Sequence, residues 1–202
     1  MPEIKFSTMA DGLRWCIWDL QDIPPLMPGD ILPGLIEIQR FDSLHHPEIK
    51  RQYLGARKAL ERLLPQGNHS LSALPNGKPI LNIPGHISLS HTVGRAAAVY
   101  HPSRPCGIDI EDVKRPFAER VIQRFTNPAE MPIIEEFGPA VLWCTKEAVY
   151  KAHGESGLHF AKDILVEQTS LEQATARVKN KISYSISNFW IANTVVSVAV
   201  LK

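Results

Sequence analysis

The sequence contains few cysteines and no long apolar run, and each absence excludes a class of protein. Its three cysteines, Cys16, Cys106 and Cys144, include no C-x-x-C pair, which argues against a disulfide framework and against a zinc cluster. No apolar stretch approaches the roughly 20 residues of a membrane-spanning helix, and the first residues lack the apolar core of a signal peptide. We therefore expect a cytoplasmic protein with no membrane partner.

The sequence also has almost no excess of positive over negative charge. Lysine and arginine number 22 against 21 aspartates and glutamates, which gives a formal net charge of +1. An extended nucleic-acid-binding surface needs a clustered basic excess, so we expect no nucleic acid partner. The net charge does not exclude a local phosphate-binding pocket. The 202 residues, 44% of them hydrophobic, suffice for one domain or for two small halves that share an interface.

Two carboxylates alternate with apolar residues in the segment G-I-D-I-E, residues 107–111. This alternation predicts a strand, and period-two geometry places Asp109 and Glu111 on one face, with Ile108 and Ile110 on the other. Carboxylates this close together repel each other unless a cation or a base lies between them. Taken alone, the pair is also compatible with the solvated face of an edge strand.

A helical stripe in residues 143–151 complements the acid pair. Trp143, Glu147 and Lys151 recur every four residues and therefore lie along one side of a helix. This side adds a third carboxylate and a lysine, and hard oxygen ligands of this kind suit Mg²⁺. On its own, Glu147 four residues before Lys151 is equally typical of a surface ion pair.

Five separated segments, in the family's order, resemble the 4′-phosphopantetheinyl transferases. The two signature segments are G-I-D-I-E at residues 107–111 and W-x-x-K-E-A-x-x-K at residues 143–151. The others are G-K-P at residues 77–79, I-S-L-S-H-T at residues 87–92 and R-F-T-N at residues 124–127. The chain is most similar in length to the longer, two-half (surfactin-synthetase-activating) type.

The resemblance implies an α+β fold of two similar halves, residues 1–105 and 106–202, related by a pseudo-twofold axis. Each half is expected to be a small antiparallel sheet packed on a long helix, with the active site at their interface, and the protein to be a monomer. The residue patterns themselves predict long helices at residues 47–64 and 139–153, the second ended by Gly154. They also predict a short helix at residues 117–125 and strands at residues 14–20, 87–90, 96–100, 107–111, 164–167, 182–190 and 194–201.

The resemblance also implies a reaction, the transfer of the 4′-phosphopantetheine group of coenzyme A to a serine hydroxyl of an apo carrier protein. The other product is 3′,5′-adenosine bisphosphate. Mg²⁺ held by Asp109, Glu111 and Glu147 would neutralise the pyrophosphate oxygens. Glu147, directly or through a metal-bound water, would accept the serine proton. Lys151 would neutralise the transferring phosphate or protonate the leaving group.

Residues of the first half are expected to hold the nucleotide end of coenzyme A. Helical position favours Arg57, which falls beside the apolar stripe, over Arg51, which points nearly opposite to it. Lys78, Ser90 and His91 take this role only through the resemblance. For the basic side chains the alternative is an ordinary surface position.

Two departures from the family pattern affect these expectations. Ser88 stands where the family has asparagine, and one extra residue separates Gly154 from Gly157. Lys146 either assists the reaction or lies at the surface, and the carrier is not identified. The alternative functions are a metal-dependent nucleotide phosphohydrolase and a non-catalytic module that binds coenzyme A or a carrier protein.

Overall fold

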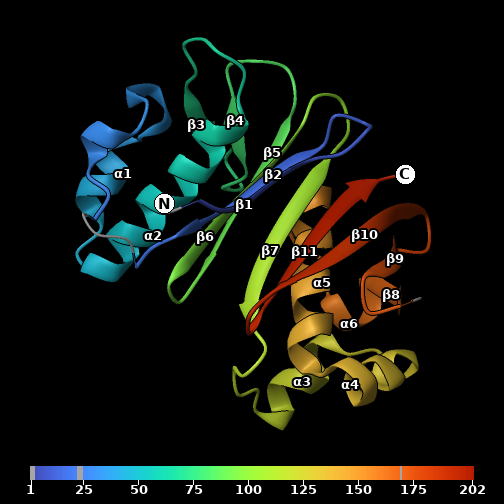
Figure 1. The fold of residues 1–202 in the computed structure, drawn as a ribbon. Coiled ribbons are helices and arrows are strands. Elements are labelled where there is room, and N and C mark those ends of the chain that lie inside the picture. The colour runs from blue at the N-terminus through green and yellow to red at the C-terminus, as the bar shows by residue number, and fades with distance from the viewer. Residues whose placement is uncertain (1–2, 22–24, 169) are drawn as a thin grey trace. The chain divides into compact units, whose positions relative to one another are not determined.

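The chain divides into two compact units, Met1–Arg104 and Pro105–Lys202. The structure, a computed structural model, describes residues 3–21, 25–168 and 170–202 (Figure 1). Within these ranges, none of the helices combines the length and the apolar character that crossing a membrane requires.

The first unit is built on a four-stranded antiparallel sheet with the strand order β1-β2-β6-β5. Its strands are β1 (Glu3–Thr8), β2 (Arg14–Asp19), β5 (His86–Thr92) and β6 (Arg95–His101). A separate two-stranded sheet joins β3 (Leu71–Ala73) to β4 (Pro79–Leu81). The helices are α1 (Ile38–Ser43) and α2 (Pro47–Leu63), and two short 3-10 turns cover Pro28–Asp30 and Pro33–Leu35.

Helix α2 packs along β6 and β2 because one of its sides is apolar. Leu60 and Leu63 on this side are completely buried. The approach to the sheet is close, since a Cβ on Gly55 would lie 2.2 Å from the Leu20 side chain and 3.2 Å from the Ala96 Cβ. The small residues Gly55 on α2 and Ala96 on β6 therefore allow the helix to pack closely against the sheet.

The second unit is built on a five-stranded antiparallel sheet with the strand order β7-β11-β10-β9-β8. Its strands are β7 (Cys106–Asp112), β8 (Ile164–Gln168), β9 (Gln173–Val178), β10 (Ile182–Ile191) and β11 (Thr194–Leu201). Its helices are α3 (Glu119–Phe125), α4 (Met131–Phe137), α5 (Pro139–His153) and α6 (Phe160–Asp163), with a 3-10 turn at Pro128–Glu130.

Helix α5 packs against β7 and β11 of this sheet. Gly107 of β7 marks the close approach, because a Cβ there would lie 2.0 Å from the Ala148 carbonyl oxygen and 2.5 Å from the Ala152 backbone nitrogen. Only glycine leaves room for the helix backbone at this position. The face of β7 that carries Gly107 is therefore the face turned toward α5.

The predicted α+β architecture with antiparallel sheets is confirmed, whereas the pseudo-twofold relation of the halves stays a prediction. Helix α5 has the predicted bounds, and Gly154, with a φ of 73°, ends it. The sequence patterns do not predict β1, α1, α4 or β9. Pro132 lies in the first turn of α4, where proline is tolerated although it resembles a loop signal. The inward residues of β9 include Ala174 and Ala176, and alanine is a weak strand former.

Candidate active site

Strand β7 presents two acids to helix α5. Gly107, Asp109 and Glu111 alternate along the strand and so share the face turned toward the helix. Asp109 is 6% exposed and Glu111 is 7% exposed, and carboxylates are rarely buried to this extent without partners. Ile108 and Ile110 are buried on the opposite face.

Helix α5 supplies a cation to this face. The Lys151 Nζ lies 2.6 Å from the Asp109 Oδ1 and donates a 3.3 Å hydrogen bond to the Ile108 carbonyl oxygen. Lys151 stands one helical turn after Glu147, on the stripe that begins at Trp143. The structure thus brings the lysine of one signature segment into direct contact with an acid of the other.

A second cation, Arg115, pairs with the second acid. Its Nη1 forms an ion pair with the Glu111 Oε2, and its guanidinium carbon lies 4.8 Å from the centre of the Phe117 ring. The Glu111 Oε1 accepts a 3.1 Å hydrogen bond from the Asp112 backbone N–H. The sequence patterns do not single out Arg115, because it follows the strand in a turn, where a spacing of four residues implies no fixed geometry.

All four of these charged side chains affect the pKa of Glu147. Burial raises the pKa of Glu147 and Lys151 opposes that effect, while Asp109 and Glu111 raise the pKa further and Arg115 lowers it. The two acids and two cations therefore share one electrostatic neighbourhood with Glu147. We refer to Asp109, Glu111 and Glu147 as the acid cluster.

The acid cluster has the chemistry of a Mg²⁺ site. Its oxygens are hard ligands, and a divalent cation would relieve the repulsion that contributes to the raised pKa of Glu147. Among the residues that the structure describes, however, no group of three or more His, Cys, Asp or Glu side chains is arranged to hold a metal ion. Lys151 and Arg115 instead neutralise two of the acids. The donor set fits Mg²⁺, and the closing of the three acids around an ion stays a prediction.

Lys146, the neighbour of Glu147 in α5, is completely buried. Its Nζ lies 2.6 Å from the Glu130 Oε2, and both side chains are 0% exposed. The same Nζ donates hydrogen bonds to the carbonyl oxygens of Phe160, at 3.0 Å, and Ile164, at 2.8 Å. Burial lowers the pKa of Lys146, and Glu130 raises it. The interpretation of Lys146 as a surface side chain is wrong, because it fastens α5 to the turn Pro128–Glu130 and to β8.

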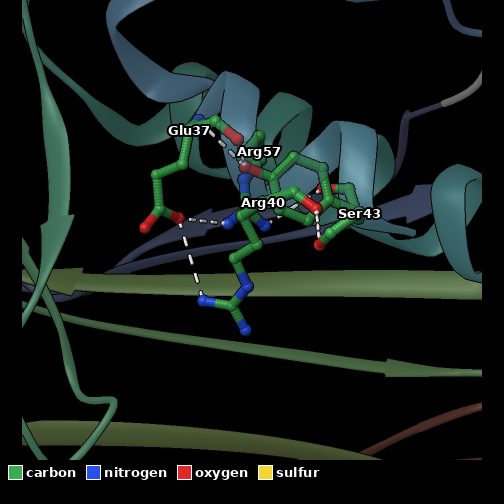
Figure 2. Close-up of polar contacts among 5 residues, drawn as sticks. Glu37, Arg40, Ser43 and Arg57 are labelled. Atoms are coloured by element: carbon green, nitrogen blue, oxygen red, sulfur yellow. Dashed lines mark hydrogen bonds and ion pairs between the residues drawn. The ribbon is translucent and has the colours of Figure 1, made fainter.

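The two arginines proposed for the nucleotide lie on different sides of α2. Arg57 is 5% exposed, with its Nη2 2.9 Å from the Glu37 Oε2 and its guanidinium carbon 3.2 Å from the centre of the Tyr53 ring (Figure 2). Burial lowers the pKa of Arg57, and Tyr53 and Glu37 oppose that effect. Arg51 is exposed and pairs with Glu48 at 2.8 Å, the geometry of a surface ion pair.

The remaining nucleotide-binding candidates lie on the strands of the first unit and in its β3–β4 turn. Ser90 and His91 are consecutive in β5, so their side chains leave opposite faces of the sheet. Ser90 is buried, as is Ser88 two residues earlier, whereas His91 is exposed. Lys78 lies near His86, whose pKa is lowered first by burial and then by the charge of Lys78. The structure therefore does not bring Ser90 and His91 to one surface.

The loop with the extra residue, Gly154 to Gly157, begins at an anchored histidine. The His153 Nδ1 lies 3.0 Å from the Tyr184 Oη, and its Nε2 lies 3.3 Å from the Glu155 Oε2. Burial, together with the charge of Glu155, raises the pKa of Tyr184 to about 12, so its hydroxyl keeps its proton at neutral pH. The loop is thus tied to β10 at the end of α5.

The second unit also matches a known protein family. Residues 105–199 match the family described as the 4′-phosphopantetheinyl transferase superfamily. The matched segment contains the whole acid cluster together with Lys151 and Arg115. No curated protein matches the chain.

Proposed function

Through residues 105–199 this chain belongs to the 4′-phosphopantetheinyl transferase superfamily, and we propose that it modifies an apo carrier protein. The reaction transfers the 4′-phosphopantetheine group of coenzyme A to a serine hydroxyl and releases 3′,5′-adenosine bisphosphate. The observation that carries this proposal is the placement of Glu147, a carboxyl of raised pKa, one helical turn from a lysine that contacts Asp109.

Glu147 is the proposed general base. As the serine oxygen bonds to the phosphorus next to pantetheine, the bond from that phosphorus to the bridging oxygen of the pyrophosphate breaks. The serine proton passes to the Glu147 carboxylate. A carboxylate accepts a proton more effectively when its pKa approaches the working pH, and burial moves Glu147 in that direction.

Lys151 is the proposed partner of the transferring phosphate. Its side chain is partly exposed, and its Nζ already lies against Asp109 and the Ile108 carbonyl oxygen. The lysine therefore stands directly beside the acids that are proposed to hold the metal ion. It would neutralise the phosphate that is transferred, or protonate the bisphosphate that leaves.

Asp109, Glu111 and Glu147 are the residues that would hold Mg²⁺. When bound, this ion supplies neutralisation of the pyrophosphate oxygens. Lys151 pairs with Asp109 and Arg115 pairs with Glu111, so the ion would either share these carboxylates with the two cations or displace them. The departure of Lys151 from Asp109 would in turn make its ammonium group available to the substrate phosphate.

Arg57, Arg51, Lys78, Ser90 and His91 are the proposed contacts to the nucleotide end of coenzyme A. Arg57 has structural support, because it is a buried guanidinium held in one orientation by Tyr53. The other four rest on the resemblance of their segments to the family. Binding energy from such a remote group serves to position the reacting phosphate. On the same resemblance we propose the two-half type, a monomer and a cytoplasmic location.

An intact-mass assay tests the proposed reaction. Each apo carrier protein of the host is incubated with the full chain, coenzyme A and Mg²⁺, and one carrier is expected to gain the mass of a phosphopantetheine group. Replacing its acceptor serine by alanine should abolish the gain, and the Glu147→Gln enzyme should show little of it. Cleavage of coenzyme A without any carrier would point to a phosphohydrolase. Coenzyme A binding without transfer to any carrier would point to a binding module.

A further inference from the structure

The carboxylate of Glu37 lies between two arginines in the first unit (Figure 2). Its Oε2 is 2.9 Å from the Arg57 Nη2 and 3.8 Å from the Arg40 Nη1. The Arg57 side chain is 6% exposed, whereas the Arg40 side chain is 58% exposed. A single oxygen anion thus joins a buried guanidinium to a solvent-exposed one.

Arg57 is held in place by contacts that do not involve Glu37. Its Nη1 donates a 3.3 Å hydrogen bond to the Tyr53 carbonyl oxygen, and its guanidinium carbon lies 3.2 Å from the centre of the Tyr53 ring. Its Nε–H is buried and has no hydrogen-bond partner in the part of the chain that the structure describes. The arginine therefore keeps its orientation, and a spare donor, when its anionic partner changes.

The backbone of Glu37 is anchored separately from its carboxylate. Its N–H donates a 2.9 Å hydrogen bond to the Tyr53 Oη, and its carbonyl oxygen accepts a 3.4 Å hydrogen bond from the same hydroxyl. The side chain is 25% exposed, so rotation about its own torsions can carry the carboxylate into solvent. The segment before α1 need not move for the anion to leave.

We propose that the Glu37 carboxylate is a placeholder that a phosphate monoester displaces, binding between Arg57 and Arg40. Guanidinium groups bind carboxylate and phosphate through the same paired N–H donors, and phosphate offers more charge and one more oxygen. Because the ion pair to Glu37 must break first, weakly charged anions are rejected. The inference rests on the proposed function only in naming the phosphate monoester of coenzyme A, absent from dephospho-coenzyme A, as the ligand.

Calorimetric titration of the full chain tests the exchange, with Glu37→Gln as the main variant. Glutamine keeps the size of the side chain and a neutral oxygen for Arg57, so the fold should persist. We expect inorganic phosphate and coenzyme A to bind about tenfold more tightly to Glu37→Gln than to the unaltered protein. Dephospho-coenzyme A should bind equally to both. Arg40→Ala changes an exposed side chain. When it is combined with Glu37→Gln, the double variant should bind phosphate and coenzyme A less tightly than Glu37→Gln alone.

Glu167→Gln is the matched control, because Glu167 is an exposed glutamate paired with an arginine, Arg177, at 2.6 Å. It makes the same change in net charge and should leave the affinities for inorganic phosphate, coenzyme A and dephospho-coenzyme A unchanged. Unchanged or weaker phosphate binding by Glu37→Gln, or an equal gain for dephospho-coenzyme A, would overturn the exchange. A phosphate gain without any coenzyme A binding would uphold the exchange and count against the proposed function.

Discussion

Lys151 is the side chain through which helix α5 and strand β7 are linked electrostatically. Its Nζ contacts the Asp109 Oδ1 at 2.6 Å and the Ile108 carbonyl oxygen at 3.3 Å. The same charge opposes the effect of burial on the pKa of Glu147. One cation therefore interacts favourably with two carboxylates whose charges otherwise repel each other.

Replacing Lys151 by alanine should damage turnover rather than coenzyme A binding. Lys151 is proposed to act on the transferring phosphate, while residues of the first unit are proposed to bind the nucleotide. We expect kcat to fall by about 10²- to 10⁴-fold and the KM for coenzyme A to change by less than about threefold. Initial rates of carrier modification over a series of coenzyme A concentrations separate the two constants.

Lys162→Ala is the matched control for this change, since Lys162 is an exposed lysine of α6 and should leave both constants unchanged. A higher KM with unaltered kcat in Lys151→Ala would assign the lysine to substrate binding instead. The far-ultraviolet circular dichroism of both variants should match that of the unaltered protein, which separates a catalytic defect from unfolding.

The burial of a single side chain could be predicted from the sequence, whereas its interaction partner could not. Helical spacing alone places Arg57 beside the apolar side of α2 and Arg51 away from it, and their burial follows this difference. The partner of Arg57, Glu37, lies 20 residues earlier in the chain. Tertiary packing selects such a partner, and no local spacing records it.

At the scale of elements, the glycine of G-I-D-I-E controls how closely α5 can approach β7. A Cβ at Gly107 would lie 2.0 Å from the Ala148 carbonyl oxygen and 2.5 Å from the Ala152 nitrogen. Both are backbone atoms of a helix, so neither can swing aside as a flexible side chain would. The short distance between helix and strand is what allows Lys151 to reach Asp109.

Replacing Gly107 by alanine should therefore separate α5 from β7 and weaken the fold. We expect a loss of about 3 kcal/mol in the free energy of unfolding, together with a loss of transferase activity as Lys151 moves away from Asp109. Urea unfolding at constant slope measures the first effect, and the intact-mass assay measures the second. Gly29→Ala is the control, because among the described residues nothing apart from its own chain neighbours lies within 4 Å of that Cβ position. The control should stay within about 0.5 kcal/mol, and an equally mild effect of Gly107→Ala would contradict the close-approach argument.

Elements with strong local signals could be predicted from the sequence, and those that depend on tertiary contacts could not. Pro139 and Gly154 define the bounds of α5 through proline at its start and a left-handed glycine at its end. Strand β9 has only the small apolar residues Ala174 and Ala176 and Val178 on its inward side. β9 is held in the sheet by its pairing with β8 and β10. Its own sequence does not predict this pairing.

For the whole molecule, the segment that matches the family coincides with one of the two units. Residues 105–199 match the family and lie within the unit Pro105–Lys202. The signature segments identify the acids and Lys151 because their spacing is local to one strand and one helix. Arg115, which neutralises Glu111, is absent from those patterns, since a turn rather than a regular element positions it.

Mg²⁺ should stabilise the folded chain, because a ligand that binds only the folded state raises the free energy of unfolding. Saturating MgCl₂ is expected to add about 1–3 kcal/mol and to raise the thermal unfolding temperature by about 2–8 °C. Removal of the ion with a chelator should reverse the rise. Asp109→Asn should lose most of it, because this change removes one carboxylate charge from the acid cluster.

The adjacent acid Asp112 provides the control for the metal experiment. Asp112 is the next position beyond Glu111 and so lies on the face of β7 opposite the acid cluster, where it accepts a 2.8 Å hydrogen bond from the Lys114 N–H. Asparagine can accept the same bond, so Asp112→Asn should keep the full response to Mg²⁺. An equal rise in all three proteins, or the same rise with NaCl at matched ionic strength, would mean that Mg²⁺ acts by general screening and not through the acid cluster.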